Sequence, residues 1–344
     1  MNARDLGIRV GELEPGANDA ITDVAGVRVG HTTLIEGENI RTGVTAILPT
    51  PNGEECFAGA HRLNGNGELT GLEWIRESGY LTTPVGLTNT FSVGVVRDAI
   101  VAAQHAANRG RWHLPVVGET YDGFLNEIEG MHVRPEHVFD ALERATDGAV
   151  EQGAVGGGTG MICHGFKGGI GTASRMTAAG NTVGILVQAN HGRRTRLSVN
   201  GVPVGRLLED VPLLETREDS PEGSIIVVVA TDAPLLPHQC DRLAQRSALG
   251  IARTGGAGEN SSGDFALAFS TGNRNPERGP VDFVRNEEID PLFYATIEAT
   301  EEAILNALLN GQTMSGRSGT VHALPRDRFQ QLIASAERYT GDRT

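Results

Sequence analysis

The chain has 344 residues and a formal net charge of −14, because 43 Asp and Glu residues outnumber 29 Lys and Arg residues. This acidic balance, without any basic run, argues against nucleic-acid binding and against an anionic membrane surface, since both require clustered Lys and Arg. The longest aliphatic stretch, residues 225–230, is far shorter than the ~20 residues that span a bilayer.

The start of the sequence has no apolar segment of the secretory type, so we expect a cytoplasmic protein. The three cysteines, Cys56, Cys163 and Cys240, are too few and too scattered for a disulfide framework. No histidine pattern has the spacing of metal ligands, and we expect neither a metal nor an organic cofactor.

Strands and helices are predicted from period-two and 3.6-residue apolar patterns bounded by Gly, Pro or Asn. In chain order they are strands 27–34 and 43–48, helices 93–108 and 135–146, strands 182–188 and 224–230, helix 237–253, strand 265–271, helix 291–309, strand 319–324 and helix 325–338. The strands come in pairs more than in strict βαβ alternation. This order favours an α+β sandwich, with helices outside two packed sheets, over a doubly wound parallel sheet.

Two of these strands carry specific burial signals. Residues 224–230 are apolar on both faces, which predicts a central strand. Residues 265–269 place three large side chains on one face and only alanines on the other, which predicts a closely covered strand. Residues 207–223, which precede the strand 224–230, are acidic and include two prolines. They have neither a period-two nor a 3.6-residue apolar pattern, so we interpret them as a solvated loop.

A glycine-rich stretch at residues 153–160 is similar to a phosphate cradle but does not match GxGxxG, and no GK[ST] follows it. We therefore interpret it as a turn whose backbone amides point into a cavity, a feature that can also stabilise an anionic intermediate. An uncleaved ligand-binding protein that uses residues 153–171 is the alternative from a different functional class.

Gly223 and Ser224 stand where the acidic segment meets the buried strand. If the bond between them is bent, the Ser224 hydroxyl can attack the Gly223 carbonyl, and glycine suits this step because it has no Cβ. Hydrolysis of the ester would leave Ser224 as a new N-terminus, whose α-amino group titrates near ~7.7–8.0 and can act as a base. By itself the Gly-Ser pair is a weak signal, since Ser224 can equally be the first residue of a strand.

Several stretches, in one order over nearly the whole chain, resemble the self-processing L-aminopeptidase/D-esterase (DmpA-like) and β-peptidyl aminopeptidase family. The matching stretches are residues 21–31, 67–73, 84–94, 117–123, 153–171, 188–192 and 223–236. So many matches in one order are much more specific than any single motif.

The resemblance implies an αββα four-layer sandwich like that of N-terminal-nucleophile hydrolases, with a different connectivity. It implies one peptidase domain, residues 1–344, cut into an α chain of residues 1–223 and a β chain of residues 224–344. It also implies a homo-oligomer of such αβ pairs, commonly a tetramer.

Five residues fall on positions with catalytic roles in the family. The resemblance makes Ser224 the nucleophile and Asn190 an oxyanion donor; Tyr121 matches an active-site tyrosine, and Ser262 and Asp264 match a second serine and an acidic residue near the new amine. From the sequence alone, Asn190 can also be a cap or turn residue, Tyr121 a core aromatic and Asp264 a turn residue. Ser261 suits the role of Ser262 equally well on spacing.

An aminopeptidase must also bind the substrate's cationic amine, and a nearby carboxylate is needed because a desolvated, unpaired ammonium is costly. Glu119 and Asp264 are the candidates. In β-peptide-cleaving relatives we expect Glu at the position of Asp264, so the shorter side chain leaves cleavage of β-peptides open.

The sequence thus predicts a self-processing serine aminopeptidase that acts on short peptides, amino-acid amides or esters through an acyl-enzyme on Ser224. Acyl transfer to an amine, as in ornithine acetyltransferases of related fold, is the closest alternative. Side-chain specificity and L or D preference depend on pocket shape, which the sequence does not define.

Overall fold

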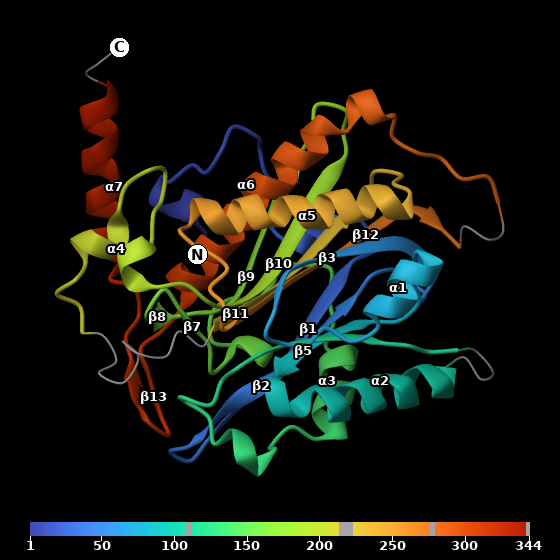
Figure 1. Ribbon diagram of the computed structural model, residues 1–344, viewed down its shortest axis with the longest axis horizontal. Coiled ribbons are helices and arrows are strands. Elements are labelled where there is room, and N and C mark those ends of the chain that lie inside the picture. The colour runs from blue at the N-terminus through green and yellow to red at the C-terminus, as the bar shows by residue number, and fades with distance from the viewer. Residues whose placement is uncertain (108–111, 213–222, 276–278, 342–344) are drawn as a thin grey trace.

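The computed structural model describes residues 1–107, 112–212, 223–275 and 279–341. Within them, two sheets pack face to face between two layers of helices (Figure 1). The four-stranded sheet has the order β1 (Arg28–Glu36), β2 (Ile40–Leu48), β5 (Val85–Asn89) and β6 (Val116–Thr120). The six-stranded sheet has the order β4 (Tyr80–Leu81), β3 (Cys56–Gly65), β12 (Ser262–Arg274), β11 (Gly223–Thr231), β10 (Thr182–Asn190) and β9 (Gly169–Met176).

Helices cover both outer faces of this pair of sheets. The helices are α1 (Leu72–Ser78), α2 (Val93–Ala107), α3 (Pro135–Glu143), α4 (Val204–Leu207), α5 (Pro237–Arg253), α6 (Asp290–Asn310) and α7 (Arg326–Gly341). Figure 1 shows α5 and α6 over the six-stranded sheet and α2 and α3 below the four-stranded one. One apolar cluster lies between the sheets, and separate clusters lie under each helical layer. The predicted αββα sandwich is therefore confirmed.

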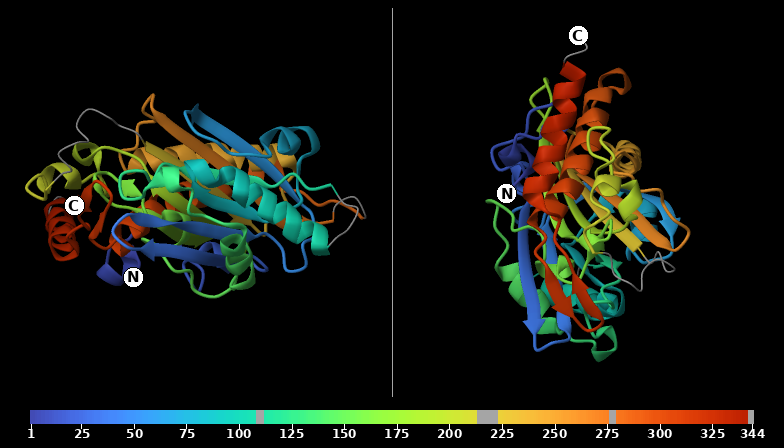
Figure 2. Two further views of the ribbon diagram at one scale, coloured as in Figure 1. Left: turned by 90° about the horizontal axis from the view of Figure 1, so that it is seen from below. Right: turned by 90° about the vertical axis from the view of Figure 1, so that its left-hand side faces the viewer.

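The remaining described elements lie at the edge of the sandwich. Two small hairpins pair β7 (Ile162–Cys163) with β8 (Phe166–Lys167) and β13 (Met314–Gly316) with β14 (Gly319–Val321). Helix α7 stands at one side, next to α4 (Figures 1 and 2). None of the helices in the described residues is both long and apolar enough to cross a bilayer.

The central strand β11 is buried on both faces, as its sequence predicts. Ile225 and Val227 pack under the helices, whereas Ile226 and Val228 pack between the sheets. In β12 the large side chains, which include Phe265, lie between the sheets, and the alanines face the helical layer. Both burial predictions are confirmed.

Eight of the described strands were not predicted: β3, β4, β5, β6, β7, β8, β9 and β13. Strand β9 shows why, because a Cβ on Gly171 would lie 1.9 Å from the carbonyl oxygen of Ala303 in α6. Glycine is needed there for the close approach of the helix, and it removes the β-branched signal from the strand. The predicted strand 319–324 ends earlier, at Val321, and the predicted helix 135–146 ends at Glu143. Most of the predicted acidic loop, residues 213–222, lies outside the described residues.

We expected the backbone amides of the glycine-rich stretch to point into a cavity, and for Gly156 and Gly157 this prediction is wrong. The Gly156 N–H donates to Thr33 Oγ1 at 2.9 Å and the Gly157 N–H donates to Thr45 Oγ1 at 3.2 Å. Both glycines are buried, and a Cβ on Gly157 would lie 2.2 Å from Gln188 Oε1. This turn packs tightly between the sheets because it lacks side chains.

Candidate active site

Ser224 is the second residue of β11, between two neighbouring strands that set its surroundings. It pairs with Gly263 on the parallel strand β12 and with Asn190 on the antiparallel strand β10. Its Oγ donates a hydrogen bond to the Gly223 carbonyl oxygen at 2.7 Å and accepts one from the Gly263 N–H at 3.2 Å. The hydroxyl is therefore held beside the carbonyl group of the bond at which the sequence predicts cleavage.

Gly223 lies in a confined place. A Cβ at this position would stand 3.1 Å from the Asn190 carbonyl oxygen and 3.2 Å from His191 Cα. Both contacts are to backbone atoms, which cannot move aside as the end of a flexible side chain can. The structure thus gives a steric reason for glycine directly before Ser224.

Ser262 and Asp264 form a hydrogen-bonded pair at the start of β12. Ser262 Oγ donates to Asp264 Oδ1 at 2.6 Å, and the same oxygen accepts the Ile225 N–H at 3.2 Å. Asn64 Oδ1 accepts the backbone N–H of Asp264 at 2.7 Å. Burial raises the pKa of the Asp264 carboxyl, while its hydrogen bonds oppose that shift. Of the two adjacent serines, Ser262 is the one whose hydroxyl donates to this carboxylate.

Asn190 ends β10, and both ends of its side-chain amide are bonded. Its Oδ1 accepts the Ile162 N–H at 2.8 Å, and its Nδ2 donates to the Tyr121 carbonyl oxygen at 3.0 Å. Because a carboxamide nitrogen carries two hydrogens, one donor remains beyond the bond to Tyr121. The amide is buried and fixed in orientation on the side of Ser224, and Asn190 caps no helix.

Glu119 comes from the opposite sheet, near the end of β6. Its Oε1 accepts the Glu68 N–H at 2.9 Å, and its Oε2 accepts the Thr90 hydroxyl. Burial raises the pKa of this carboxyl. A Cβ on Gly67 would lie 2.9 Å from Glu119 Oε1 and 3.1 Å from Gly263 Cα. Gly67 therefore lies between the Glu119 carboxylate and Gly263, the residue that pairs with Ser224.

Tyr121 follows β6 and is half-buried. Its backbone carbonyl oxygen accepts a hydrogen bond from the Asn190 side-chain amide. The structure thus brings all the predicted site residues into one region, and the Tyr121 carbonyl connects this residue to Asn190.

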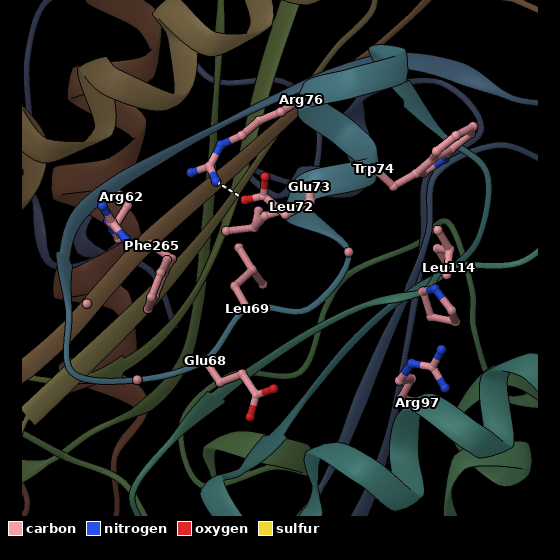
Figure 3. A pocket seen from close by; sticks show the side chains of 14 residues that line it. Arg62, Glu68, Leu69, Leu72, Glu73, Trp74, Arg76, Arg97, Leu114 and Phe265 are labelled. Atoms are coloured by element: carbon pink, nitrogen blue, oxygen red, sulfur yellow. Dashed lines mark hydrogen bonds and ion pairs between the residues drawn. The ribbon is translucent and has the colours of Figure 1, made fainter.

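A pocket of about 420 Å³ opens beside this region (Figure 3). Gly67 and Phe265 belong to its wall, and Figure 3 shows Arg62 beside Phe265, with Arg97 near Leu114 on the other side. Because Gly67 also abuts Glu119 and Gly263, the pocket lies next to the predicted amine-binding carboxylate. Ser224 itself does not line it.

One group in the described residues can offer metal ligands: Cys163, His164 and His191, whose ligand atoms lie within 4.8 Å of one another. Burial lowers the pKa of His164 to about 4 and that of His191 well below its usual value, so both imidazoles are neutral. The Arg194 guanidinium donates to the His164 carbonyl oxygen at 3.2 Å and lowers the pKa of His164 further. The same positive charge disfavours a metal cation.

Sequence reasoning missed several supporting groups, among them Asn64, Thr90, Ile162 and the Gly263 N–H. Gly67 and Thr90 lie in the stretches 67–73 and 84–94, which resemble the family, and this resemblance was the only sequence signal that could have indicated them. The bonds made by Ile162 and Gly263 use backbone N–H groups, which no residue type reveals.

The layered fold and the serine at the start of a central strand define a serine hydrolase of the N-terminal-nucleophile fold class. The chain belongs to peptidase family S58, whose model matches residues 19–322. It is 47% identical to the β-peptidyl aminopeptidase BapA of Sphingosinicella microcystinivorans, over 98% of this chain and 92% of the relative.

Two solved structures extend this likeness. A Burkholderia sp. β-aminopeptidase matches with a TM-score of 0.92 and 54% identity, over 97% of this chain and 99% of that one. The L-aminopeptidase D-Ala-esterase/amidase of Ochrobactrum anthropi, described as a prototype for the serine aminopeptidases, matches with a TM-score of 0.89 and 42% identity, over 98% and 99% of the two chains. The predicted enzyme class, a hydrolase of the aminopeptidase type, is confirmed.

Proposed function

We propose that the protein cuts its own chain between Gly223 and Ser224 and then releases N-terminal residues from short peptides, amino-acid amides or esters. The observation that carries the proposal is the position of Ser224 Oγ, 2.7 Å from the Gly223 carbonyl oxygen, at the start of the strand that faces Asn190. In this arrangement the same hydroxyl first attacks the peptide bond of its own chain and later attacks the substrate.

Self-cleavage proceeds by attack of Ser224 Oγ on the Gly223 carbonyl carbon. The C–N bond breaks, an ester joins Gly223 to the serine oxygen, and the released nitrogen takes up the hydroxyl proton. Water then hydrolyses the ester, which gives the chains 1–223 and 224–344. The new α-amino group of Ser224 titrates near ~7.7–8.0, so that it can accept the hydroxyl proton at neutral pH.

In the mature enzyme, Ser224 forms the acyl-enzyme and Asn190 stabilises the oxyanion. The second N–H of the Asn190 amide supplies this donor, an effect worth about 3–4 kcal/mol in comparable sites. Ser262 and Asp264 hold the new ammonium: Asp264 Oδ1 already accepts from the Ser262 hydroxyl and from the Ile225 N–H, one residue beyond Ser224. Tyr121 fixes the Asn190 amide through its carbonyl.

Glu119, with Asp264, binds the amine of the substrate. Burial raises the pKa of its carboxyl and so disfavours the charged form; an incoming ammonium favours that form again and offsets part of the cost of burial. The names of the relatives support substrates with an N-terminal β-amino acid, and we include these in the proposed substrate class. We further propose a cytoplasmic homo-oligomer of αβ pairs, a tetramer, which light scattering of the purified protein tests.

The activity is tested with p-nitroanilides of L-α-, D-α- and β-amino acids, using protein whose fragments have been verified by mass spectrometry. We expect p-nitroaniline release from L-α- and β-aminoacyl substrates, none from N-acetylated ones, and none with Ser224→Ala. Hydroxylamine added as an acceptor distinguishes hydrolysis from acyl transfer. Turnover by Ser224→Ala at the wild-type rate would contradict the proposal.

A further inference from the structure

Lys167, in β8, carries a buried amino group that the proposed mechanism does not use, and burial lowers its pKa to about 7. It is fully buried, and none of the ion pairs among the described residues includes it. Its Nζ instead donates to three backbone carbonyl oxygens, those of Met161 at 2.8 Å, Gly168 at 2.9 Å and Gly158 at 3.4 Å. In the protonated form the ammonium has three hydrogens, and each of them has an acceptor, which favours that form against the effect of burial.

These carbonyls belong to the glycine-rich segment that leads to the active site. The Met161 oxygen also accepts the Gly168 N–H at 3.0 Å, so Lys167 ties together both sides of the small β7–β8 hairpin. The next residue after Met161 is Ile162, whose N–H donates to Asn190 Oδ1 at 2.8 Å. A short path of bonds therefore leads from the buried ammonium to the amide next to Ser224.

Asn190 has two anchors, and the Lys167 hairpin supplies one of them. The Tyr121 carbonyl engages the nitrogen of the amide, and the Ile162 N–H engages its oxygen. Without the Ile162 bond, the amide can rotate about its last side-chain torsion, which is broad for asparagine. The second N–H, which we propose as the oxyanion donor, would then lose its fixed direction.

We propose that Lys167 is a positioning residue for catalysis: by gathering the Gly158, Met161 and Gly168 carbonyls, it places the Ile162 N–H that orients the Asn190 amide. This inference rests on the proposed role of Asn190. Lys167 does not touch the substrate, so its loss lowers kcat and leaves KM nearly unchanged.

Arg175 provides a matched control, because it is also a fully buried cation. Its guanidinium makes ion pairs with Asp19, Glu298 and Glu302, at the side of the sheet under α6. None of these contacts leads to Asn190. Arg175→Met thus removes a buried charge without removing an anchor of the amide.

The test is a double-mutant cycle between Lys167→Met and Asn190→Ala, with rates normalised to the amount of chain that begins at Ser224. We expect Lys167→Met to lower kcat by about tenfold or more, up to the roughly 10²–10³-fold that loss of an oxyanion donor costs, and to leave KM within about threefold. Once Asn190 is Ala, Lys167→Met should cost almost nothing further, because residues that act through each other are not additive. The fold-losses in kcat caused by Arg175→Met and by Asn190→Ala should instead multiply in the double variant.

Independent, multiplicative effects of Lys167→Met and Asn190→Ala would overturn the inference, as would a change in KM alone. Full activity of Asn190→Ala would also overturn this inference. Self-cleavage before Ser224 is measured separately, by mass, and that part of the proposed function would not be affected. If Lys167→Met folds but stays uncleaved, the same cycle is read on the rate of self-cleavage. If it does not fold, Lys167→Arg, which keeps charge and donors, and Lys167→Gln take its place, and Lys167→Arg should retain more activity.

Discussion

Ser224 and Asn190 are directly opposite each other on the antiparallel strands β11 and β10. Opposed residues of an antiparallel pair project from the same face of a sheet, so the hydroxyl and the amide share the space between the two sheets. A slip of one residue in this register would move one of them to the helical side. The burial of β11 on both faces makes that slip costly, and the core thereby fixes the geometry of the site.

Asn190→Asp separates the two functions of the amide. The carboxylate keeps an oxygen for the Ile162 N–H but loses the donor, and it adds a negative charge next to the developing oxyanion. We expect kcat to fall by about 10²–10³-fold, at least as far as in Asn190→Ala. Steady-state kinetics on verified cleaved enzyme check this, and an activity close to wild type would exclude Asn190 as the donor.

Gly223→Ala should slow self-cleavage, because its Cβ would meet the Asn190 carbonyl oxygen at 3.1 Å and His191 Cα at 3.2 Å. Gly223→Val should block it. The readout is the fraction of cleaved chain over time on a denaturing gel. Gly148→Ala is the matched control, since a Cβ there has no atom within 4 Å among the described residues. Once cleaved, the Ala variant should turn over at the wild-type rate, because residue 223 takes no part in the later steps.

The acid side of the pH–activity profile should lie above the range of ordinary carboxyl groups. Burial raises the pKa of both Glu119 and Asp264, so each becomes protonated, and loses its ability to hold an ammonium, at a higher pH than usual. Activity should therefore fall further as the pH drops through those raised values, below the first loss that protonation of the Ser224 α-amine causes near ~7.7–8.0. Glu119→Gln should raise KM for substrates with a free amine and remove its part of this acid limb in kcat/KM. An unchanged KM and profile would count against Glu119 as the amine ligand.

Asp122→Asn should change how stability depends on pH. Burial raises the pKa of Asp122 from 3.8 to about 7, so the folded state binds this proton more tightly than the unfolded state. The wild-type protein therefore loses stability as the pH rises from about 4 through about 7. The variant keeps an oxygen for the Asn126 amide, which donates at 3.0 Å in the wild type. Calorimetry should show the variant gaining on the wild type as the pH rises from about 4 to about 7, with no further gain above that, because both states are then deprotonated. Equal slopes over this range would refute the assignment.

Asp264→Glu tests the link between this side chain and β-peptide cleavage. A longer carboxylate reaches further toward the Ser224 amine, and we expect it at this position in β-peptide-cleaving relatives. The ratio of kcat/KM for β-aminoacyl to α-aminoacyl p-nitroanilides should rise. An unchanged ratio would mean that the pocket, and not residue 264, sets the preference.

The sequence predicts the layers and the nucleophile strand well, because long apolar patterns such as residues 224–230 carry their own burial signal. It fails at β9 and at the glycine-rich turn, where Gly171 and Gly157 are dictated by close backbone approach. Such contacts depend on partners far away in the chain, for example Ala303 opposite Gly171. Because glycines have no side chain, β9 and the glycine-rich turn show no apolar periodicity in the sequence.

The site residues themselves come from the resemblance, because no local spacing joins Asn190, Ser224 and Asp264. Only the sheet brings them together. Lys167 shows the opposite case: lysines are mostly exposed, yet this one is fully buried, with backbone carbonyls as hydrogen-bond acceptors. Backbone carbonyls are present at every position, so residue types give no signal for hydrogen bonds of this kind.

The central claim is that the working serine is also the first residue of a chain. N-terminal sequencing and intact-mass measurement of freshly purified, active protein test it most directly. The account predicts two polypeptides, residues 1–223 and 224–344, the smaller beginning Ser-Ile-Ile, and a single uncut chain for Ser224→Ala. Full activity in a preparation that contains only the intact 344-residue chain would contradict it.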